Sequence, residues 1–298
     1  MEDNKLFNEA ICNNTITHRN FYKDFFKATF KKTSFIIPFL IISLIFIVGF
    51  IMCNFTEFAN IKDINLELSF SSPSLKYPFG LNEFGQNQLY LVLICSYKTL
   101  LLAFIVTLIN TTIGIFIGIA WGSSKNFSRV MFIVKNVLDN VPLIFFYIIV
   151  ISLLGSGFIS LLIAFILFGW IEMATITRNN LTIIKSKDYN KISQLYDVSL
   201  FKRAINNYLP AILPILFNNI ALCVPQIIAL EMSISYFGFS IGENSTNLGT
   251  LIYSSISNNT CIKYPHLFII PFLFLFIINT CIYLISKTIS TNFIKEEI

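Results

Sequence analysis

Three acidic side chains stand within or at the ends of long apolar segments of this sequence: Asp139, Glu172 and Glu231. A charge near the middle of a bilayer costs at least about 2.5 kcal/mol, so such a group usually faces a cavity or a partner. Asp139 is the deepest candidate, and Lys135 precedes it by one helical turn, which favours a structural ion pair. Glu172 and Glu231 also fit ordinary positions at a membrane interface, where the cost is lower.

No group of side chains has the spacing of a catalytic or metal site. The six cysteines are scattered without a C-x-x-C pair, which argues against both a metal site and a disulfide framework. His18 and His266 are isolated, and the sequence contains no glycine-rich phosphate-binding loop. We therefore expect a protein that is not an enzyme and holds no cofactor or metal. If transport uses ATP, another chain must hydrolyse it.

The composition is that of an integral membrane protein. Of the 298 residues, 55% are hydrophobic and only 12% are charged, against roughly 25% charged in a soluble domain. Lys and Arg lie beside the apolar segments and form no single stripe, so nucleic-acid binding is not expected. Apolar runs of about 20 residues can cross a bilayer. The sequence predicts six such spans, at about 34–53, 98–121, 130–154, 158–174, 209–230 and 266–285.

The basic residues predict the orientation of these spans. With residues 1–33 as a cytoplasmic segment, only four of the 21 Lys and Arg residues fall outside the cell: Lys62, Lys76, Lys98 and Lys263. This positive-inside bias places both termini in the cytoplasm. The resulting division is a first helix at 34–53, an extracellular loop at 54–97, a five-helix core at 98–290 and a tail at 291–298.

A long polar stretch, Trp170 to Pro210, interrupts the apolar segments and carries six basic residues. Its centre reads as two short helices, and on helical spacing Ile192, Leu195 and Tyr196 share one face. Such an amphipathic helix on the cytoplasmic side suits docking onto a soluble partner. An ordinary loop lying on the lipid headgroups fits the same spacing.

The fifth span carries polar side chains in a helix with Pro214 and Pro225. Prolines release backbone carbonyls that buried neighbours must satisfy, so this helix is expected to face the protein interior. Four residues on it are candidates to line a transport pathway: Asn218, Asn219, Gln226 and Glu231. A hydrogen bond between helices is an equally good interpretation of each one taken singly.

Four short motifs resemble one permease family. Residues 77–87 are similar to its H-P-F-G-T-D-x-x-G-R-D signature, and residues 170–178 match its W-x-x-x-A-x-x-x-R pattern. Residues 231–239 look like its E-A-x-L-S-F-L-G-L motif, and residues 248–252 resemble its W-G-x-M-L motif. The family comprises the C-type permease subunits of dipeptide, oligopeptide and nickel ABC importers, and the resemblance covers roughly residues 20 to 290.

The resemblance implies a six-helix, all-α permease of the type I ABC importer fold in a bacterial cell membrane. It would pair with a B-type permease, two ATP-binding subunits and an extracellular substrate-binding lipoprotein. The cytoplasmic loop 175–208 would then hold the coupling helix that contacts an ATP-binding subunit. The residues expected at that contact are Lys191, Ile192, Ser193, Leu195, Tyr196 and Asp197.

The coupling motif departs from the family pattern. The family's Glu-Ala-Ala falls on Lys191–Ile192–Ser193, and its following glycine falls on Asp197. Lys191 inverts the charge that the ATP-binding subunit meets, which indicates a partner with a complementary acidic residue or a weakened coupling. In the outer loop, Phe79, Gly80 and Gly85 are kept, and the two glycines would supply tight turns.

Three functions stay open at this point. The first is a permease of an ABC importer for peptides, or for nickel or a metallophore complex. The second is an ion-coupled secondary transporter, which predicts inverted repeats that the sequence does not display convincingly. The third is a membrane scaffold without transport activity, for which the altered coupling motif would be natural.

Overall fold

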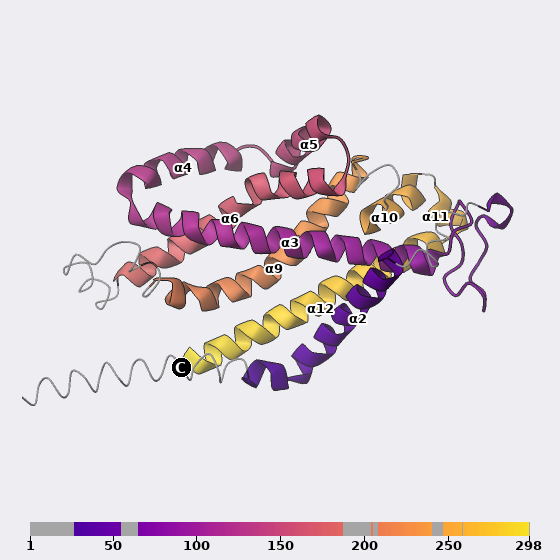
Figure 1. Cartoon of the computed structure of the whole chain (residues 1–298), viewed down its shortest axis with the longest axis horizontal. Helices are drawn as coiled ribbons and strands as arrows, with labels where there is room; N and C mark the ends of the chain where they lie inside the picture. Colours follow the sequence, from indigo (N-terminus) through magenta and orange to yellow (C-terminus); the bar gives the residue numbers. More distant parts are fainter. Residues whose placement is uncertain are drawn as a thin grey trace, which may run out of the picture.

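In a computed structural model, every element of the described part of the chain is helical, apart from turns and one isolated β-bridge between Leu81 and Asn87 (Figure 1). The described residues are 27–54, 65–186, 204, 208–239, 247–257 and 259–297. The helices are α2 (Thr33–Asn54), η2 (Leu66–Leu68), α3 (Gln88–Ser123), α4 (Lys125–Asp139), α5 (Leu143–Leu154), α6 (Phe158–Ser186), α9 (Leu209–Tyr236), α10 (Leu248–Ser257), α11 (Thr260–Lys263) and α12 (His266–Glu297).

Several helices are long and apolar enough to cross a membrane. Within the described residues, α2, α3, α6 and α12 meet this condition, and the bent pair of α4 and α5 makes a fifth span if it is counted as one. The apolar part of α9, Leu222–Tyr236, is shorter. The molecule is therefore a multi-pass helical membrane protein, while the count of six spans and the orientation stay predictions.

The α3 helix is the centre of the bundle. It packs most extensively against α6 and also contacts α2, α9, α4 and α12. Figure 1 shows α3 running the length of the molecule between α6 and α9, with α2 and α12 paired along one side. With 36 residues, α3 is roughly 54 Å long, so it extends well beyond a hydrocarbon layer of about 30 Å.

Glycines allow α3 and α6 to pack closely. Gly114 and Gly118 lie one turn apart on α3, and a Cβ on Gly118 would come within 2.5 Å of the Thr177 Cβ and 2.7 Å of the Ala174 carbonyl oxygen. A Cβ on Gly114 would lie 2.6 Å from the Met173 Cβ. Small residues four apart let helix backbones approach closely in membranes. The two helices therefore form a tight pair that positions the side chains described below.

The predicted third span is not one helix. The chain bends by 86° between α4 and α5, at Asn140–Pro142. Pro142 has no N–H to donate and its ring disfavours a helical residue before it, so α4 ends at Asp139 and a new helix begins at Leu143. With 12 residues, α5 is too short to cross a bilayer alone.

Several helices extend beyond the spans expected from the sequence, and α3 and α6 are two of them. The α3 helix begins at Gln88, ten residues before the expected start, because Asn87 caps it by accepting a hydrogen bond from Leu89 N at 3.0 Å. The α6 helix continues to Ser186, so the first part of the predicted cytoplasmic loop is helical. Lys185 Nζ donates to the Gly122 carbonyl oxygen at 2.6 Å and joins this extension to α3.

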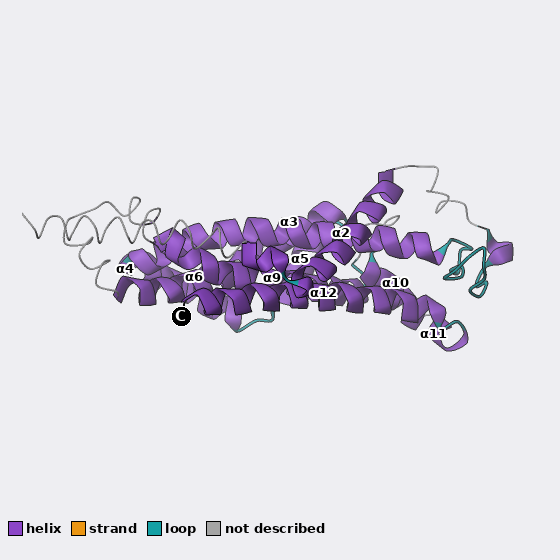
Figure 2. Cartoon of the chain, turned by 90° about the horizontal axis from the view of Figure 1, so that it is seen from below, coloured by secondary structure: helices purple, strands orange, loops and turns teal. Residues whose placement is uncertain are grey.

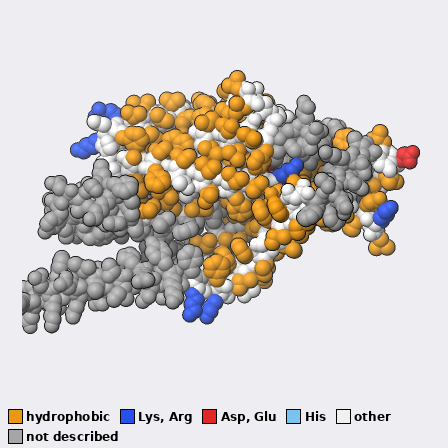
Figure 3. Space-filling view, in the orientation of Figure 1, with side chains coloured by type: hydrophobic (Ala, Val, Ile, Leu, Met, Phe, Trp, Pro, Cys, Tyr) orange, Lys and Arg blue, Asp and Glu red, His pale blue; other side chains and the backbone are white. Residues whose placement is uncertain are grey.

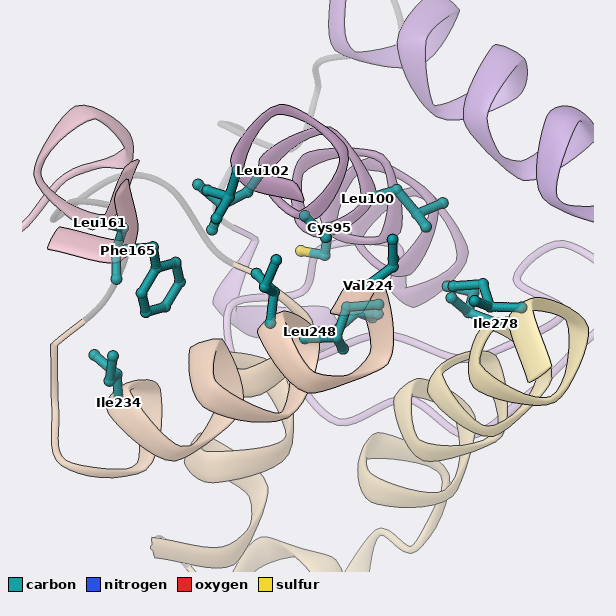
Figure 4. Packing of buried hydrophobic residues seen from close by; sticks show 14 of the residues in the cluster. Cys95, Leu100, Leu102, Leu161, Phe165, Val224, Ile234, Leu248 and Ile278 are labelled. Atoms are coloured by element: carbon teal, nitrogen blue, oxygen red, sulfur yellow. The ribbon is translucent and has the colours of Figure 1, made fainter. Parts of the chain in front are cut away.

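Apolar side chains from α3, α6, α9, α10 and α12 meet in one cluster (Figure 4). Leu100 and Leu102 on α3 and Leu161 on α6 are fully buried there. The surface seen in Figure 3 is largely hydrophobic across the middle of the molecule. Most of the Lys and Arg side chains in this view lie toward the ends, and one lies beside the hydrophobic area. This is the surface that a bilayer requires of a spanning bundle.

The two ends of the bundle carry different elements. The segment that follows η2 and precedes α3 lies beside α11 at one end in both views, while the start of α4 and the end of α6 lie at the other (Figures 1 and 2). The predicted outer-loop motif and the last turns of α6 therefore belong to opposite ends of the molecule.

Candidate functional site

A cavity of about 610 Å³ lies among α3, α4, α5, α6 and α9. The long helices contribute residues at helical spacing, such as Phe165, Gly169 and Glu172 on α6. On α9, Cys223, Gln226 and Ile227 line it in the same way. The break at Pro142 places α4 and α5 so that both contribute to the wall, with residues Lys135, Leu138, Asp139, Leu143 and Tyr147.

Most of the wall is apolar, but α3 supplies a row of oxygen atoms. Thr107, Asn110 and Thr111 line the cavity and are each at least nine-tenths buried. Thr107 Oγ1, Asn110 Oδ1 and Thr111 Oγ1 have no hydrogen-bond partner within the described part of the chain. Asn110 Nδ2 donates to the Phe165 carbonyl oxygen at 3.1 Å, which fixes the amide against α6. Buried polar atoms without partners are rare in folded proteins, and here three lie together on the face of α3 beside the cavity.

The cavity wall includes one basic and two acidic side chains, Lys135, Asp139 and Glu172. Lys135 and Asp139 form an ion pair across one turn of α4, as their spacing predicted. In the isolated chain 57% of the Asp139 side chain is accessible, and its depth in the bilayer stays a prediction. Glu172 is exposed within the cavity, and no ion pair joins it to a described Lys or Arg.

The predicted pathway residues on α9 separate into different environments. Gln226 lines the cavity, whereas Asn219 and Glu231 do not belong to its wall. The side chain of Asn218 lies outside the described residues. Glu231 is only 1% exposed and takes part in a second, structural cluster.

That second cluster links α9, α10 and α3. Glu231 Oε1 accepts hydrogen bonds from Thr99 Oγ1 at 3.2 Å and from Asn247 Nδ2 at 2.9 Å. Asn247 Nδ2 also lies 3.0 Å from Ser235 Oγ, and Asn247 Oδ1 accepts from Thr250 N at 2.7 Å. The carboxylate therefore lies among neutral donors inside the bundle and is not part of the wall of the 610 Å³ cavity.

The outer-loop motif folds into tight turns. Gly80 and Gly85 have φ values of +74° and +73°, which glycine adopts without strain. A Cβ on Gly85 would also lie 2.0 Å from the Asn65 carbonyl oxygen. Between the two glycines, Asn82 Oδ1 accepts hydrogen bonds from Phe84 N at 3.0 Å and Gln86 N at 2.8 Å. The Phe79 ring packs edge-on against Phe274 of α12 at a centroid distance of 6.1 Å.

The six predicted coupling residues, Lys191 to Ser193 and Leu195 to Asp197, lie outside the described residues. The structure places the ends of the two flanking helices, α6 at Ser186 and α9 at Leu209.

The sequence reasoning missed the row on α3. Its signal is visible in retrospect, since Thr107, Asn110 and Thr111 interrupt an apolar run and share one helix face. Because α9 contains prolines, the candidate pathway residues were placed on that helix instead.

Comparison with known proteins assigns this arrangement to a class. A family model described as "Binding-protein-dependent transport system inner membrane component" matches residues 110–295. The oligopeptide transport system permease protein AmiD of Streptococcus pneumoniae is 27% identical over 250 residues, covering 83% of this chain and 80% of that protein. The dipeptide transport system permease protein DppC of Lactococcus lactis is 28% identical over 206 residues, covering 68% of this chain and 59% of that protein. The oligopeptide transport system permease protein OppC of Bacillus subtilis is 25% identical over 188 residues, covering 60% and 59%.

Proposed function

Because the chain belongs to the family of binding-protein-dependent transport system inner membrane components, we propose that it is the C-type permease subunit of an ATP-driven peptide importer. Relatives named as oligopeptide and dipeptide permeases support peptides as the cargo over nickel or a metallophore. In this proposal the chain forms half of the passage through the membrane, and a second, B-type permease forms the other half.

The observation that carries the proposal is the cavity with its row of unpartnered oxygen atoms. Apolar walls alone would suit a lipid-like solute, whereas Thr107, Asn110 and Thr111 add hydrogen-bonding groups inside a spanning bundle. A peptide has apolar side chains and a polar backbone, so it requires both kinds of surface. Neutral oxygens bind such a solute without holding it tightly, which a passage needs.

Coupling to ATP hydrolysis would run through the segment after α6. Lys191, Ile192, Ser193, Leu195, Tyr196 and Asp197 are the proposed contacts with an ATP-binding subunit. The helix that leads into this segment is tied to α3 by the Lys185–Gly122 hydrogen bond and by the close glycine contacts. A push on the segment would therefore move α3 and α6 together, as a rigid unit, and change the shape of the cavity between them.

Purification of the assembly tests the proposal. The tagged chain is expected to co-purify with a second permease and two ATP-binding subunits. In the presence of peptide, an extracellular binding lipoprotein should co-purify as well. If the tagged chain is purified in mild detergent without any ATP-binding subunit, the importer proposal fails, and a secondary transporter or a scaffold replaces it.

A further inference from the structure

We propose that the carboxylate of Glu172 is a binding group for a primary ammonium of the transported peptide. The inference rests on the proposed function, since it concerns the same cavity, and it goes beyond it by naming the chemical group that the cavity recognises.

The position of Glu172 on α6 places it in the middle of the cavity wall. It follows Phe165 and Gly169 on one helix face and precedes Ile176, all of which line the cavity. Gly169 is one turn away and packs directly against Asn110, because a Cβ there would lie 2.2 Å from Asn110 Nδ2. The acid thus lies on the stretch of α6 that faces the unpartnered oxygen atoms of α3.

Among the described residues, the balance of charge in the cavity leaves this acid without an ion-pair partner. Lys135 and Asp139 neutralise each other, so Glu172 accounts for the remaining negative charge of the wall. Arg178, the next cation along α6, has its guanidinium 4.8 Å from the centre of the Phe132 ring and is engaged there. A cation that entered the cavity would therefore meet one available carboxylate.

The rest of the wall indicates which kind of cation fits. Tyr147, Phe165 and Phe168 give the wall an aromatic part, and the three unpartnered oxygens of α3 lie beside it. A bare metal ion fits poorly, since the described residues contain no group of three His, Cys, Asp or Glu side chains suited to a metal. A primary ammonium has three N–H donors and an apolar stem, so it uses the carboxylate, the neutral oxygens and the apolar wall together.

Two parts of a peptide carry such a group, the α-ammonium at its amino terminus and the side chain of lysine. Equilibrium binding to the purified permease–ATPase complex in lipid nanodiscs, without nucleotide or binding lipoprotein, separates them. The probes are radiolabelled trialanine, N-acetyltrialanine and N-acetyl-Ala-Lys-Ala. We expect trialanine to bind the unaltered complex on the order of tenfold more tightly than N-acetyltrialanine, the scale of a hydrogen bond to a charged group. N-acetyl-Ala-Lys-Ala recovers the affinity if a lysine side chain also satisfies the site, and does not if the α-ammonium alone is recognised.

Substitution connects this preference to the residue. Glu172→Gln keeps the size of the side chain and is expected to abolish the preference for a free ammonium, whereas Glu172→Asp keeps the charge and retains it. Glu67→Gln is the matched control, because it removes an exposed acid far from the cavity. An unaltered complex that does not distinguish free from acetylated peptides, or a Glu172→Gln complex that still does, overturns the inference. If either result is found while the complex still imports peptides, only the assignment of Glu172 is wrong. A complex that imports no peptide at all refutes the proposed function instead.

Discussion

The side-chain amide of Asn247 donates a 2.9 Å hydrogen bond to the carboxylate of Glu231, joining the residue before α10 to the last turns of α9. Thr99 of α3 donates to the same oxygen at 3.2 Å. Ser235 lies against Gly249, whose Cβ position would be 2.9 Å from the Ser235 Cβ. The two motifs at 231–239 and 248–252, which are separate in the sequence, are therefore one packed unit.

Asn247→Ala should loosen this unit. The change removes the amide that contacts Glu231, Ser235 and Thr250, and it leaves a carboxylate that is only 1% exposed with fewer donors. Loss of a hydrogen bond to a buried charged or polar group costs about 1.5–3 kcal/mol. We expect a clear drop in the melting temperature of the purified protein, measured by loss of the monodisperse peak after heating.

A double-mutant cycle assigns the effect to the Asn247–Glu231 contact. In the Glu231→Ala background, Asn247→Ala should lower the free energy of unfolding distinctly less than it does in the unaltered protein. The reason is that the effects of substituting two contacting residues are not additive. If Asn247→Ala lowers the free energy of unfolding equally with and without Glu231→Ala, the Asn247–Glu231 hydrogen bond contributes little to stability.

Gly118→Ala tests the close packing of α3 and α6. A methyl group at this position meets the Thr177 Cβ at 2.5 Å and the Ala174 carbonyl oxygen at 2.7 Å, and the backbone atom cannot move aside. Overpacking of this kind costs about 1–3 kcal/mol. We expect lower thermal stability and, because the α3–α6 pair forms the cavity wall, weaker peptide uptake.

Gly122→Ala is the matched control for that substitution. One turn further along α3, the added methyl meets only the side chain of Leu181, with its Cδ2 at 2.7 Å, and that side chain can rotate. Stability close to that of the unaltered protein is expected for Gly122→Ala. A loss of stability as large as that of Gly118→Ala would contradict the role given to the contact with the Ala174 carbonyl oxygen.

The sequence predicted the ion pair of Lys135 and Asp139 because it depends only on helical spacing, and the structure confirms it. It also predicted a helical membrane protein, because apolar length depends only on composition. The role of Glu231 could not be predicted in this way. Its main partner, Asn247, is brought to it by the packing of α10 against α9, which no local pattern describes.

The broken third span illustrates a different limit. Pro142 was visible in the sequence, but a membrane helix can continue past a proline when neighbours satisfy the freed carbonyls. Here the chain bends by 86° instead, and the bend is what places α4 and α5 beside the cavity. The row of oxygens on α3 was missed for a related reason, since its importance depends on which helix faces it.

The central proposal is that a separate ATP-hydrolysing subunit binds the segment between α6 and α9 and thereby drives peptide movement through this chain. The direct test is ATP-dependent accumulation of a radiolabelled tripeptide in proteoliposomes that contain the assembled complex and its binding lipoprotein. Accumulation is expected for the unaltered chain, and near-complete loss for Leu195→Asp and Tyr196→Asp at equal levels of membrane-inserted protein, because a buried charge disrupts an apolar contact. Normal accumulation by both variants, or none by the unaltered complex, would contradict the account.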